Sequence, residues 1–438
     1  MSSLAEVRLW GKTIGAVSLQ AGEEVASFEF DPAFAQSGIQ IAPLAMPLSR
    51  RVYRFPALSR RTFLGLPGLL ADSLPDKFGN ALIDAWLASQ GRQPNSFNAV
   101  ERLCYTGERG MGALEFAPAI GPRAKQTAHI EVSKLVELAS EVLTNRNNLQ
   151  ASFAGEGREE ALRDILRVGT SAGGARAKAV IAWNPETNEV RSGQVKAGKG
   201  FEYWLLKFDG VNGNKDKDKD KELEDLKGYG LIEYAYYLMA LDSGIDMSEC
   251  RLFKENGRSH FMTRRFDRLD TGEKLHMQSL CALAHYDFNM AGAYSYEQAL
   301  LVMRQLQVPM QAIEQLFRRM AFNIVSRNQD DHVKNIAFLM NKTGEWSLSP
   351  AFDLTYACNL AGAWTASHQM TMNGKRDNFT LEDFNACART GSMKRGRAAK
   401  ILAEVQATVS RWGSFAESAG VPDGVREKIQ HKLNLKPY

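Results

Sequence analysis

Within the first 120 residues, hydrophobic and polar residues alternate in separate stretches, as they do in half-buried strands. Two such stretches, EVRLWGKTIGAVSL (residues 6–19) and EVASFEFDP (24–32), predict strands near the N-terminus. A helix is predicted to begin after Pro75, with Asp76 in its first turn. GERGMGALEFAP (107–118) predicts a further strand after a glycine-rich turn. The pattern therefore indicates a small α+β module.

The middle of the chain changes period. Residues 133–166 show helical spacing of apolar side chains. Four strand-like runs follow: ILRVG (165–169), AKAVIAW (177–183), NEVRSG (188–193) and YWLLKFDG (203–210). Together they predict a second sheet.

The pattern becomes mainly helical towards the C-terminus. NKDKDKDKE (214–222) has no apolar residue and predicts a mobile surface loop. An apolar helix is predicted over residues 231–244, and a short strand over 259–269. From residue 285 the spacing is largely helical, and residues 313–324 predict a helix with one buried face.

Length and composition limit the possible classes of protein. With 438 residues, the chain is expected to form two domains or one large bilobal unit, and the candidate boundary is IGPRAKQTAHIEV (120–132). Its 44% hydrophobic and 24% charged residues are typical of a soluble globular protein, and a net charge of +4 permits nucleic-acid contact without arguing for it. Five scattered cysteines without a CxxC pair indicate reduced thiols in a cytoplasmic protein. We expect no signal peptide and no membrane span.

The segment NQDDHVKN (328–335) places several polar groups between two apolar runs. Asp330 and Asn335 are followed by a strand-like run, and a second run, WSLSPAFDL, is predicted to carry Asp353 at its end. In phosphoryl transfer, one carboxylate accepts the proton of the attacking hydroxyl, while an amide and a second carboxylate hold magnesium. A polar turn between helix and strand is the structural alternative.

A glycine-rich segment favours the phosphoryl-transfer interpretation. VGTSAGGARAK (168–178) would let backbone N–H groups approach phosphate, with Lys178 supplying charge, although it is not a Walker A loop and could be only a turn. Lys207 lies in an otherwise apolar strand, where it would pair with an anion or extend to the surface. Glu233 then lies in a helix, ahead of the Asp330 segment. This order is the one that a bilobal kinase requires.

The combination resembles the HipA family of serine/threonine kinase toxins from bacterial type II toxin–antitoxin systems. The resemblance extends nearly from end to end and is most specific in RRFDR (264–268), DDHVKNIAF (330–338) and LSPAFDL (348–354). It implies an α+β fold: a HipA-like N-terminal subdomain over residues 1–125, then a bilobal protein-kinase-like core over 126–438, with an N-lobe to about residue 270 and a mostly helical C-lobe.

The resemblance also implies roles for individual residues. Asp330 would be the catalytic base, with Asn335 and Asp353 as ligands of Mg²⁺ and phosphate. Lys207 would contact the α- or β-phosphate, and Ser171, seven residues before Lys178, would be the autophosphorylation site, with adjacent Thr170 as the alternative acceptor. The remaining ATP-binding residues would be the phosphate loop (Gly173, Gly174, Ala175, Arg176, Ala177 and Lys178), the hinge (Arg264, Arg265 and Phe266), and His332, Val333, Lys334 and Phe352.

The sequence departs from the family pattern at several of these positions. Arg176 and Ala177 replace a more polar stretch, and Arg264 replaces an acidic hinge residue. Asp331 stands where glycine is common, so the base could be either carboxylate, although the spacing to Asn335 favours Asp330. His332 would orient the loop, contact phosphate or serve a structural role.

The function implied is that of a cytoplasmic ATP- and Mg²⁺-dependent kinase toxin that phosphorylates a translation factor such as an aminoacyl-tRNA synthetase. Its partner would be a helix-turn-helix, HipB-like antitoxin, and operator DNA would be bound only through that complex. Basic patches at residues 375–376 and 394–400 would at most contact DNA phosphates. The alternatives are a kinase-weak corepressor scaffold and a small-molecule kinase on the same architecture.

Overall fold

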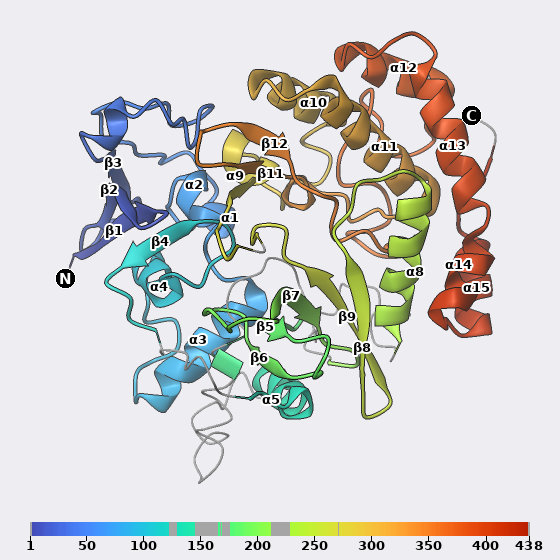
Figure 1. Cartoon of the computed structure of the whole chain (residues 1–438). Helices are drawn as coiled ribbons and strands as arrows, with labels where there is room; N and C mark the ends of the chain where they lie inside the picture. The colour runs from blue at the N-terminus through green and yellow to red at the C-terminus, as the bar shows by residue number, and fades with distance from the viewer. Residues whose placement is uncertain are drawn as a thin grey trace. The chain divides into compact units, whose positions relative to one another are not determined.

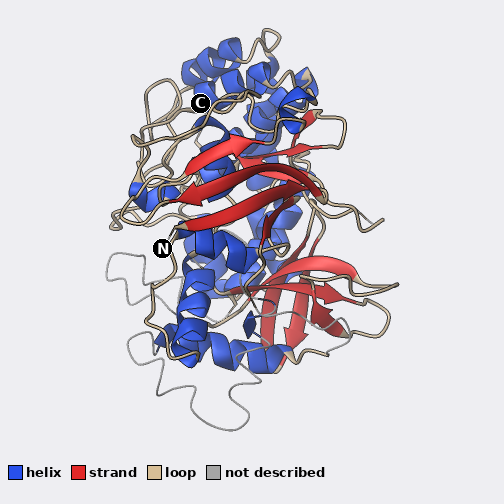
Figure 2. Cartoon of the chain, turned by 90° about the vertical axis from the view of Figure 1, so that its left-hand side faces the viewer, coloured by secondary structure: helices blue, strands red, loops and turns tan. Residues whose placement is uncertain are grey.

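A computed structural model of the chain describes residues 2–121, 129–144, 165–166, 168, 176–211, 228–269 and 271–436. Helices and strands are both abundant (Figure 2), which confirms the mixed α and β class. The chain divides into two compact units: Met1–Lys215, Phe253–Gln278 and Met340–Gly344 form the first, and Asp216–Leu252, Ser279–Leu339 and Glu345–Tyr438 form the second. The boundary expected between residues 125 and 126 lies outside the described residues and stays a prediction.

The N-terminal part of the first unit is built on an antiparallel sheet. Its strand order is β3-β2-β1-β4, with β1 over Ser3–Leu9, β2 over Lys12–Leu19, β3 over Ser27–Phe30 and β4 over Leu114–Ala117 (Figure 1). The β1–β2 turn takes Trp10 and Gly11 through positive φ values of 50° and 76°. The strands predicted from alternation are thus confirmed. Four short helices lie between β3 and β4: η1 (Phe34–Gln36), α1 (Arg60–Phe63), α2 (Gly68–Ala71) and α4 (Ala99–Thr106), in addition to α3 (Lys77–Ser89), which is described below.

A second sheet has the order β6-β5-β7-β9-β8. Its strands are β5 (Lys178–Trp183), β6 (Val190–Ser192), β7 (Glu202–Lys207), β8 (Cys250–Glu255) and β9 (Arg258–Arg264). All residues of β5 are buried, and Ala179, Ile181 and Trp183 belong to a core that also takes in side chains of α3 (Lys77–Ser89) and α5 (Val132–Thr144). This sheet confirms three of the four predicted strand runs.

The fourth run was wrongly predicted as a strand, although its first two residues also end the stretch of helical spacing over residues 133–166, which is confirmed there. Ile165, Leu166 and Val168 of the ILRVG stretch are helical, and all three are completely buried in the core of the first unit. A short run of mostly apolar residues fits a buried helix as well as a buried strand, so its periodicity could not separate the two.

The second unit is mainly helical. Its helices are α8 (Tyr229–Asp242), α9 (Leu280–Ala284), α10 (Tyr296–Gln305), α11 (Met310–Ser326), η2 (Val333–Asn335), α12 (Leu381–Thr390), α13 (Arg397–Val409), α14 (Trp412–Ala419) and α15 (Asp423–Gln430). Helix α8 packs against α14, and α11 against α13. The predicted buried face of residues 313–324 is confirmed, because Ile313, Phe317 and Ile324 of α11 are all buried.

The remaining three strands in the described part of the chain are short: β10 (His276–Ser279), β11 (Ala337–Met340) and β12 (Trp346–Leu348). The sequence placed Asp353 at the end of a strand, but β12 ends at Leu348, and Asp353 lies in the following loop with a φ of 58°. Pro350 has no N–H to continue the ladder, which explains the early end of the strand.

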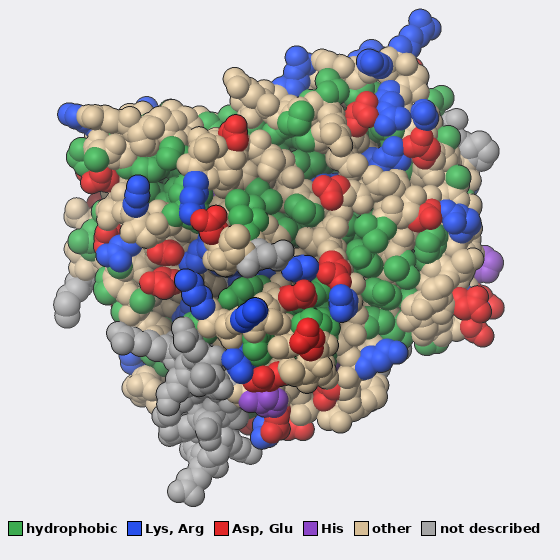
Figure 3. All heavy atoms as spheres, in the orientation of Figure 1, with side chains coloured by type: hydrophobic (Ala, Val, Ile, Leu, Met, Phe, Trp, Pro, Cys, Tyr) green, Lys and Arg blue, Asp and Glu red, His purple; other side chains and the backbone are tan. Residues whose placement is uncertain are grey.

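The charge of the surface and the length and polarity of the helices are relevant to the class of protein that the sequence predicts. In the face shown in Figure 3, acidic and basic side chains are interspersed, in keeping with the small net charge. Within the described part of the chain, the helices are too short or too polar to cross a lipid bilayer.

Candidate active site

The polar segment 328–335 lies in the second unit, between a buried helix and a buried strand. Helix α11 ends where Arg327 adopts a left-handed conformation (φ 60°), and the chain then passes through η2 into β11, all of whose residues are buried. The apolar runs on either side thus fix the loop at both ends.

The two adjacent carboxylates of this loop have different surroundings. Asp331 is buried: it accepts a hydrogen bond from the Tyr296 hydroxyl at 2.7 Å and one from the Gln369 backbone N–H at 2.7 Å, and it pairs with His368 Nδ1 at 2.9 Å. Burial alone would raise the pKa of Asp331, but the attraction of His368 and the two hydrogen bonds outweigh it and hold the pKa below its usual value. Asp331 is therefore a structural anchor of the loop.

Asp330, in contrast, has a side chain that is 42% exposed. The Trp364 indole Nε1 donates to its Oδ1 at 2.6 Å, and His332 Nε2 lies 3.8 Å from the same oxygen. Asn335 Nδ2 donates to the Asp330 backbone carbonyl at 2.9 Å, so the side-chain amide of Asn335 lies next to the backbone of Asp330. Of the two carboxylates, Asp330 is the one that a substrate could reach.

A pocket beside this loop contains Asn335 and Asp353. Its lining is formed by Tyr296, Leu316, Arg319, Asn323, Asn328, Asp331, His332, Asn335, Ile336, Ala351, Phe352, Asp353 and Leu354. Three buried polar atoms of this lining, Arg319 Nε, Asn328 Oδ1 and His332 Nδ1, have no hydrogen-bond partner within the described structure. Burying polar atoms in this way is costly, so the pocket is suited to a polar or charged occupant.

The donor set of the pocket is suited to a hard cation bound to phosphate. Asn335 and Asp353 offer oxygen atoms, which magnesium prefers. No group of three or more His, Cys, Asp or Glu side chains gathers as a metal site in the described residues. The pocket would therefore hold magnesium with few protein ligands, as is usual where phosphate oxygens and water complete the shell.

The other residues expected near ATP in this unit lie on the same loops. Phe352 lines the pocket, and Val333 is buried. The His332 ring lies 5.5 Å from the Phe288 ring, and Lys334 Nζ lies 5.3 Å from the centre of that ring. The structure thus brings Asn335, Phe352, Asp353 and His332 together around one pocket.

The two lysines expected near phosphate lie in the first unit. Lys178 and Lys207 are directly opposite each other in the β5–β7 pairing. Lys178 is buried and pairs with Asp76 at 3.4 Å, whereas Lys207 is only partly buried and lies 5.7 Å from the centre of the Phe261 ring. Lysines directly opposed in a sheet repel, and the Asp76 carboxylate offsets the charge of Lys178 at this position.

The rest of the phosphate loop is only partly described. Ala177 is buried and its carbonyl accepts from the Phe208 N–H at 3.0 Å, and Arg176 is partly exposed. Ser171, Gly173, Gly174 and Ala175 lie outside the described residues, as does Thr170. Their proposed roles stay predictions.

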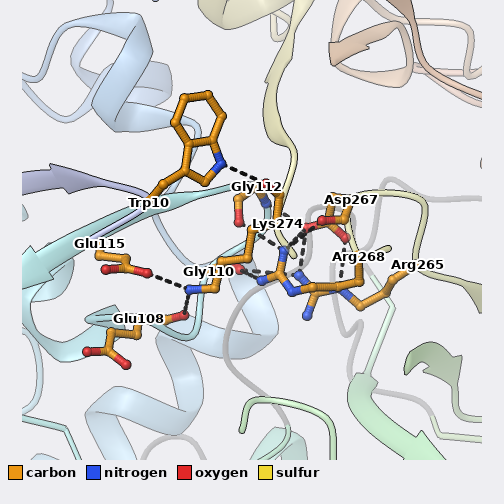
Figure 4. A network of polar contacts seen from close by, with 9 residues as sticks. All are labelled: Trp10, Glu108, Gly110, Gly112, Glu115, Arg265, Asp267, Arg268 and Lys274. Carbon is orange, nitrogen blue, oxygen red and sulfur yellow. Dashed lines mark hydrogen bonds and ion pairs between the residues drawn. The ribbon is translucent and has the colours of Figure 1, made fainter. Parts of the chain in front are cut away.

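The predicted hinge lies in a tightly bonded network of the first unit (Figure 4). Asp267 is fully buried and pairs with Arg265 and Arg268 at 2.7 Å each, and both arginines also donate to the Gly110 carbonyl. Asp267 also accepts from the Gly112 N–H at 2.7 Å. Most of the charge in RRFDR therefore binds the hinge to the 107–112 turn.

The backbone of the hinge is partly engaged as well. The Arg265 N–H donates to the Tyr203 carbonyl at 2.8 Å, and Arg264 pairs with Glu202 at 3.6 Å. Arg264, which stands where the family pattern has an acidic residue, thus has an acidic partner, Glu202, on the neighbouring strand β7. Phe266 is partly exposed.

Sequence reasoning missed several residues that shape the pocket. Arg319 and Asn323 are polar residues at a spacing of four within the buried face of α11, and this irregularity was a readable signal. Burial lowers the pKa of Arg319 to about 10, while its guanidinium donates to the Ser349 carbonyl at 2.7 Å. No sequence pattern pointed to Trp364 or His368, which reach the loop from far along the chain.

Comparison with known proteins identifies the family. The model of the HipA-like C-terminal domain matches residues 170–412, and the model of the HipA N-terminal domain matches residues 5–117. The chain belongs to the HipA family. No curated protein sequence matches it.

Among solved structures, this HipA family chain is similar to HipA of Shewanella oneidensis MR-1, from a toxin–antitoxin system complex with HipB and operator DNA. The two are 14% identical, the match covers 98% of this chain and 94% of that one, and the TM-score is 0.65. The likeness establishes a shared fold. A weaker match is CtkA, a proinflammatory kinase of Helicobacter pylori, at 12% identity, with 53% of this chain and 84% of that one covered and a TM-score of 0.36.

Proposed function

We propose that this HipA family chain is an ATP- and Mg²⁺-dependent serine/threonine protein kinase that acts as the toxin of a toxin–antitoxin module. The observation that carries the proposal is the division of labour between Asp330 and Asp331. One carboxylate is buried and fully engaged as an anchor, and the other is exposed beside a pocket with two oxygen-donor side chains. A loop built only as a turn would not need this division.

Each residue then has a role. Asp330 accepts the proton of a serine or threonine hydroxyl while that oxygen bonds to the γ-phosphorus of ATP, and the bond from this phosphorus to the bridging oxygen breaks to release ADP. Asn335 and Asp353 would hold the magnesium ion, which would neutralise negative charge on the phosphates. Lys178 and Lys207 supply positive charge to the phosphates, and backbone groups of Arg264–Phe266 bind adenine.

The resemblance supports the remaining parts of the proposal. The chain autophosphorylates at Ser171 and phosphorylates a translation factor, with an aminoacyl-tRNA synthetase as the expected class. It acts in the cytoplasm with a HipB-like antitoxin, and contacts operator DNA through that complex. The S. oneidensis structure, in which HipA is found with HipB and operator DNA, supports this partner.

The proposal is tested by mass spectrometry of the purified chain after incubation with ATP and magnesium. Phosphate is expected on Ser171 of the native chain and on no residue of an Asp330→Asn variant. A Ser171→Ala variant separates Ser171 from Thr170 as the acceptor. ATP binding is measured in parallel by its effect on the melting temperature, since a ligand that binds the folded state stabilises it.

The outcomes are distinct. Phosphate on native Ser171 that persists in Asp330→Asn would remove Asp330 as the base. ATP binding without phosphate on any variant would overturn the kinase assignment in favour of a corepressor scaffold.

A further inference from the structure

Trp364 contacts the proposed base from a distant segment of the chain. Its indole Nε1 donates to Asp330 Oδ1 at 2.6 Å, and the indole is partly buried in the second unit. An indole N–H is a donor only, so it cannot compete for the proton that a base accepts. The bond therefore orients the carboxylate without consuming its basic function.

The segment that carries Trp364 is itself held in place. Its turn is closed by a bond from the Asn359 N–H to the Thr365 carbonyl at 3.1 Å, and Asn359 Oδ1 accepts from the Ala361 N–H at 2.9 Å. The Gln369 side chain donates to the Trp364 carbonyl. The indole is thus presented on a braced turn.

The same segment also binds the neighbouring carboxylate. The Gln369 backbone N–H donates to Asp331 Oδ1 at 2.7 Å, and His368 pairs with Asp331 Oδ2. The 359–369 segment therefore contacts the loop at two adjacent residues. Gln369 and His368 bind Asp331 and so fix the loop backbone, and Trp364 binds the side chain of Asp330. His332 Nε2, at 3.8 Å, is too far from Asp330 for a hydrogen bond of comparable strength.

We propose that Trp364 is a positioning residue for Asp330, and that phosphoryl transfer requires its indole N–H. The inference rests on the proposed kinase function. Asp330 is substantially exposed, and a donor held on a braced turn favours one orientation of its carboxylate. An acceptor oxygen held towards the hydroxyl needs no reorganisation when the proton is transferred.

The test compares variants by the rate of autophosphorylation at Ser171 as a function of ATP concentration. Trp364→Phe keeps an aromatic ring and removes the donor, and it should lower the maximal rate about tenfold to a hundredfold. The ATP concentration for half-maximal rate should change by less than about twofold, because Trp364 contacts the base and not the nucleotide. A general packing defect would not produce this split.

Two further proteins make the test specific. Benzothienylalanine at position 364 keeps the shape of indole without its N–H, and should lose the same activity as Trp364→Phe. Trp412→Phe is the matched control: Trp412 is a buried tryptophan of the same unit whose Nε1 donates to the Arg426 carbonyl at 3.0 Å, and its loss should leave the rate unchanged.

The result is decided in the same experiment. Native rates, or faster rates, in both the phenylalanine and the benzothienylalanine proteins would overturn the role of Trp364. A native chain that binds ATP but transfers no phosphate would instead overturn the proposed function itself.

Discussion

Lys178 Nζ lies 3.4 Å from Asp76 Oδ2, and both side chains are almost completely buried. Asp76 is also the N-cap of helix α3, where its Oδ1 accepts from the Gly79 N–H at 2.7 Å. The pair joins a residue within the match to the HipA N-terminal domain to one within the match to the C-terminal domain. The lysine expected to bind phosphate is thus held by a carboxylate of the other domain.

We expect Asp76→Asn to destabilise the chain by about 3 kcal/mol or more, because removing one partner of a buried pair leaves a buried charge. Asparagine caps a helix as well as aspartate does, so the loss would come from the missing charge and not from α3. The measurement is the free energy of unfolding in urea. Glu23→Gln, which breaks the exposed pair with Arg54 at 2.6 Å, should change stability by about 1 kcal/mol or less. Equal effects from the two variants would refute this account.

Local patterns predicted most of the fold because they reflect local physics. Alternation identified β1 and β2, and the spacing of apolar residues identified α11. They failed where ILRVG (165–169) was interpreted as a strand, because so short a run has no clear period, and at Asp353, where Pro350 ends the ladder before the residue is reached.

The candidate site was predictable only where its residues are close in sequence. Asp330 and Asn335 could be read from one short segment. The contacts that distinguish Asp330 from Asp331 come from Trp364, His368 and Tyr296, and these depend on tertiary packing. From the sequence, the spacing to Asn335 favoured Asp330 without excluding Asp331, and the exposure of Asp330 beside buried Asp331 supports the proposal that Asp330 is the base.

The two adjacent carboxylates should respond in opposite ways to the same substitution. Asp330→Asn should abolish autophosphorylation while changing the melting temperature little, because its side chain is exposed. Asp331→Asn should lower stability by about 3 kcal/mol or more, because His368 would lose its buried partner. Melting curves and phosphorylation rates of both variants test this directly. A stable Asp331→Asn variant without activity would exchange the two roles.

The network around Asp267 should be essential for folding of the first unit. Asp267→Asn would leave Arg265 and Arg268 buried without their shared carboxylate, and we expect a loss of about 3–5 kcal/mol. Glu273→Gln, which breaks the exposed pair with Lys342 at 2.6 Å in the same unit, should cost about 1 kcal/mol or less. Chemical denaturation of both variants is the measurement, and similar losses would show that the burial of Asp267 is unimportant.

Acid should destabilise the chain through buried histidines before it does so through carboxylates. Burial lowers the pKa of His276 from 6.5 to about 3. Its Nε2 lies 3.0 Å from the Gln278 side-chain Nε2, and it can accept a hydrogen bond from that amide only while it carries no proton. Burial also lowers the pKa of His285, to about 4. The unfolded chain therefore takes up protons below pH 6.5 that the folded chain does not.

Stability is consequently full above pH 6.5 and falls as the pH drops towards 4, by about 1.4 kcal/mol per pH unit for each such histidine. The carboxylates with lowered pKa values, Asp267 and Asp331, lose their contribution only at lower pH. Unfolding free energies at pH 7.5 and 5.5 should show that His276→Gln reduces this loss by about 1.4 kcal/mol, one proton's share over the one pH unit below 6.5. His431→Gln, at an exposed position, should leave the loss unchanged. The same pH dependence in His276→Gln as in the native chain would show that His276 is not a source of the acid sensitivity.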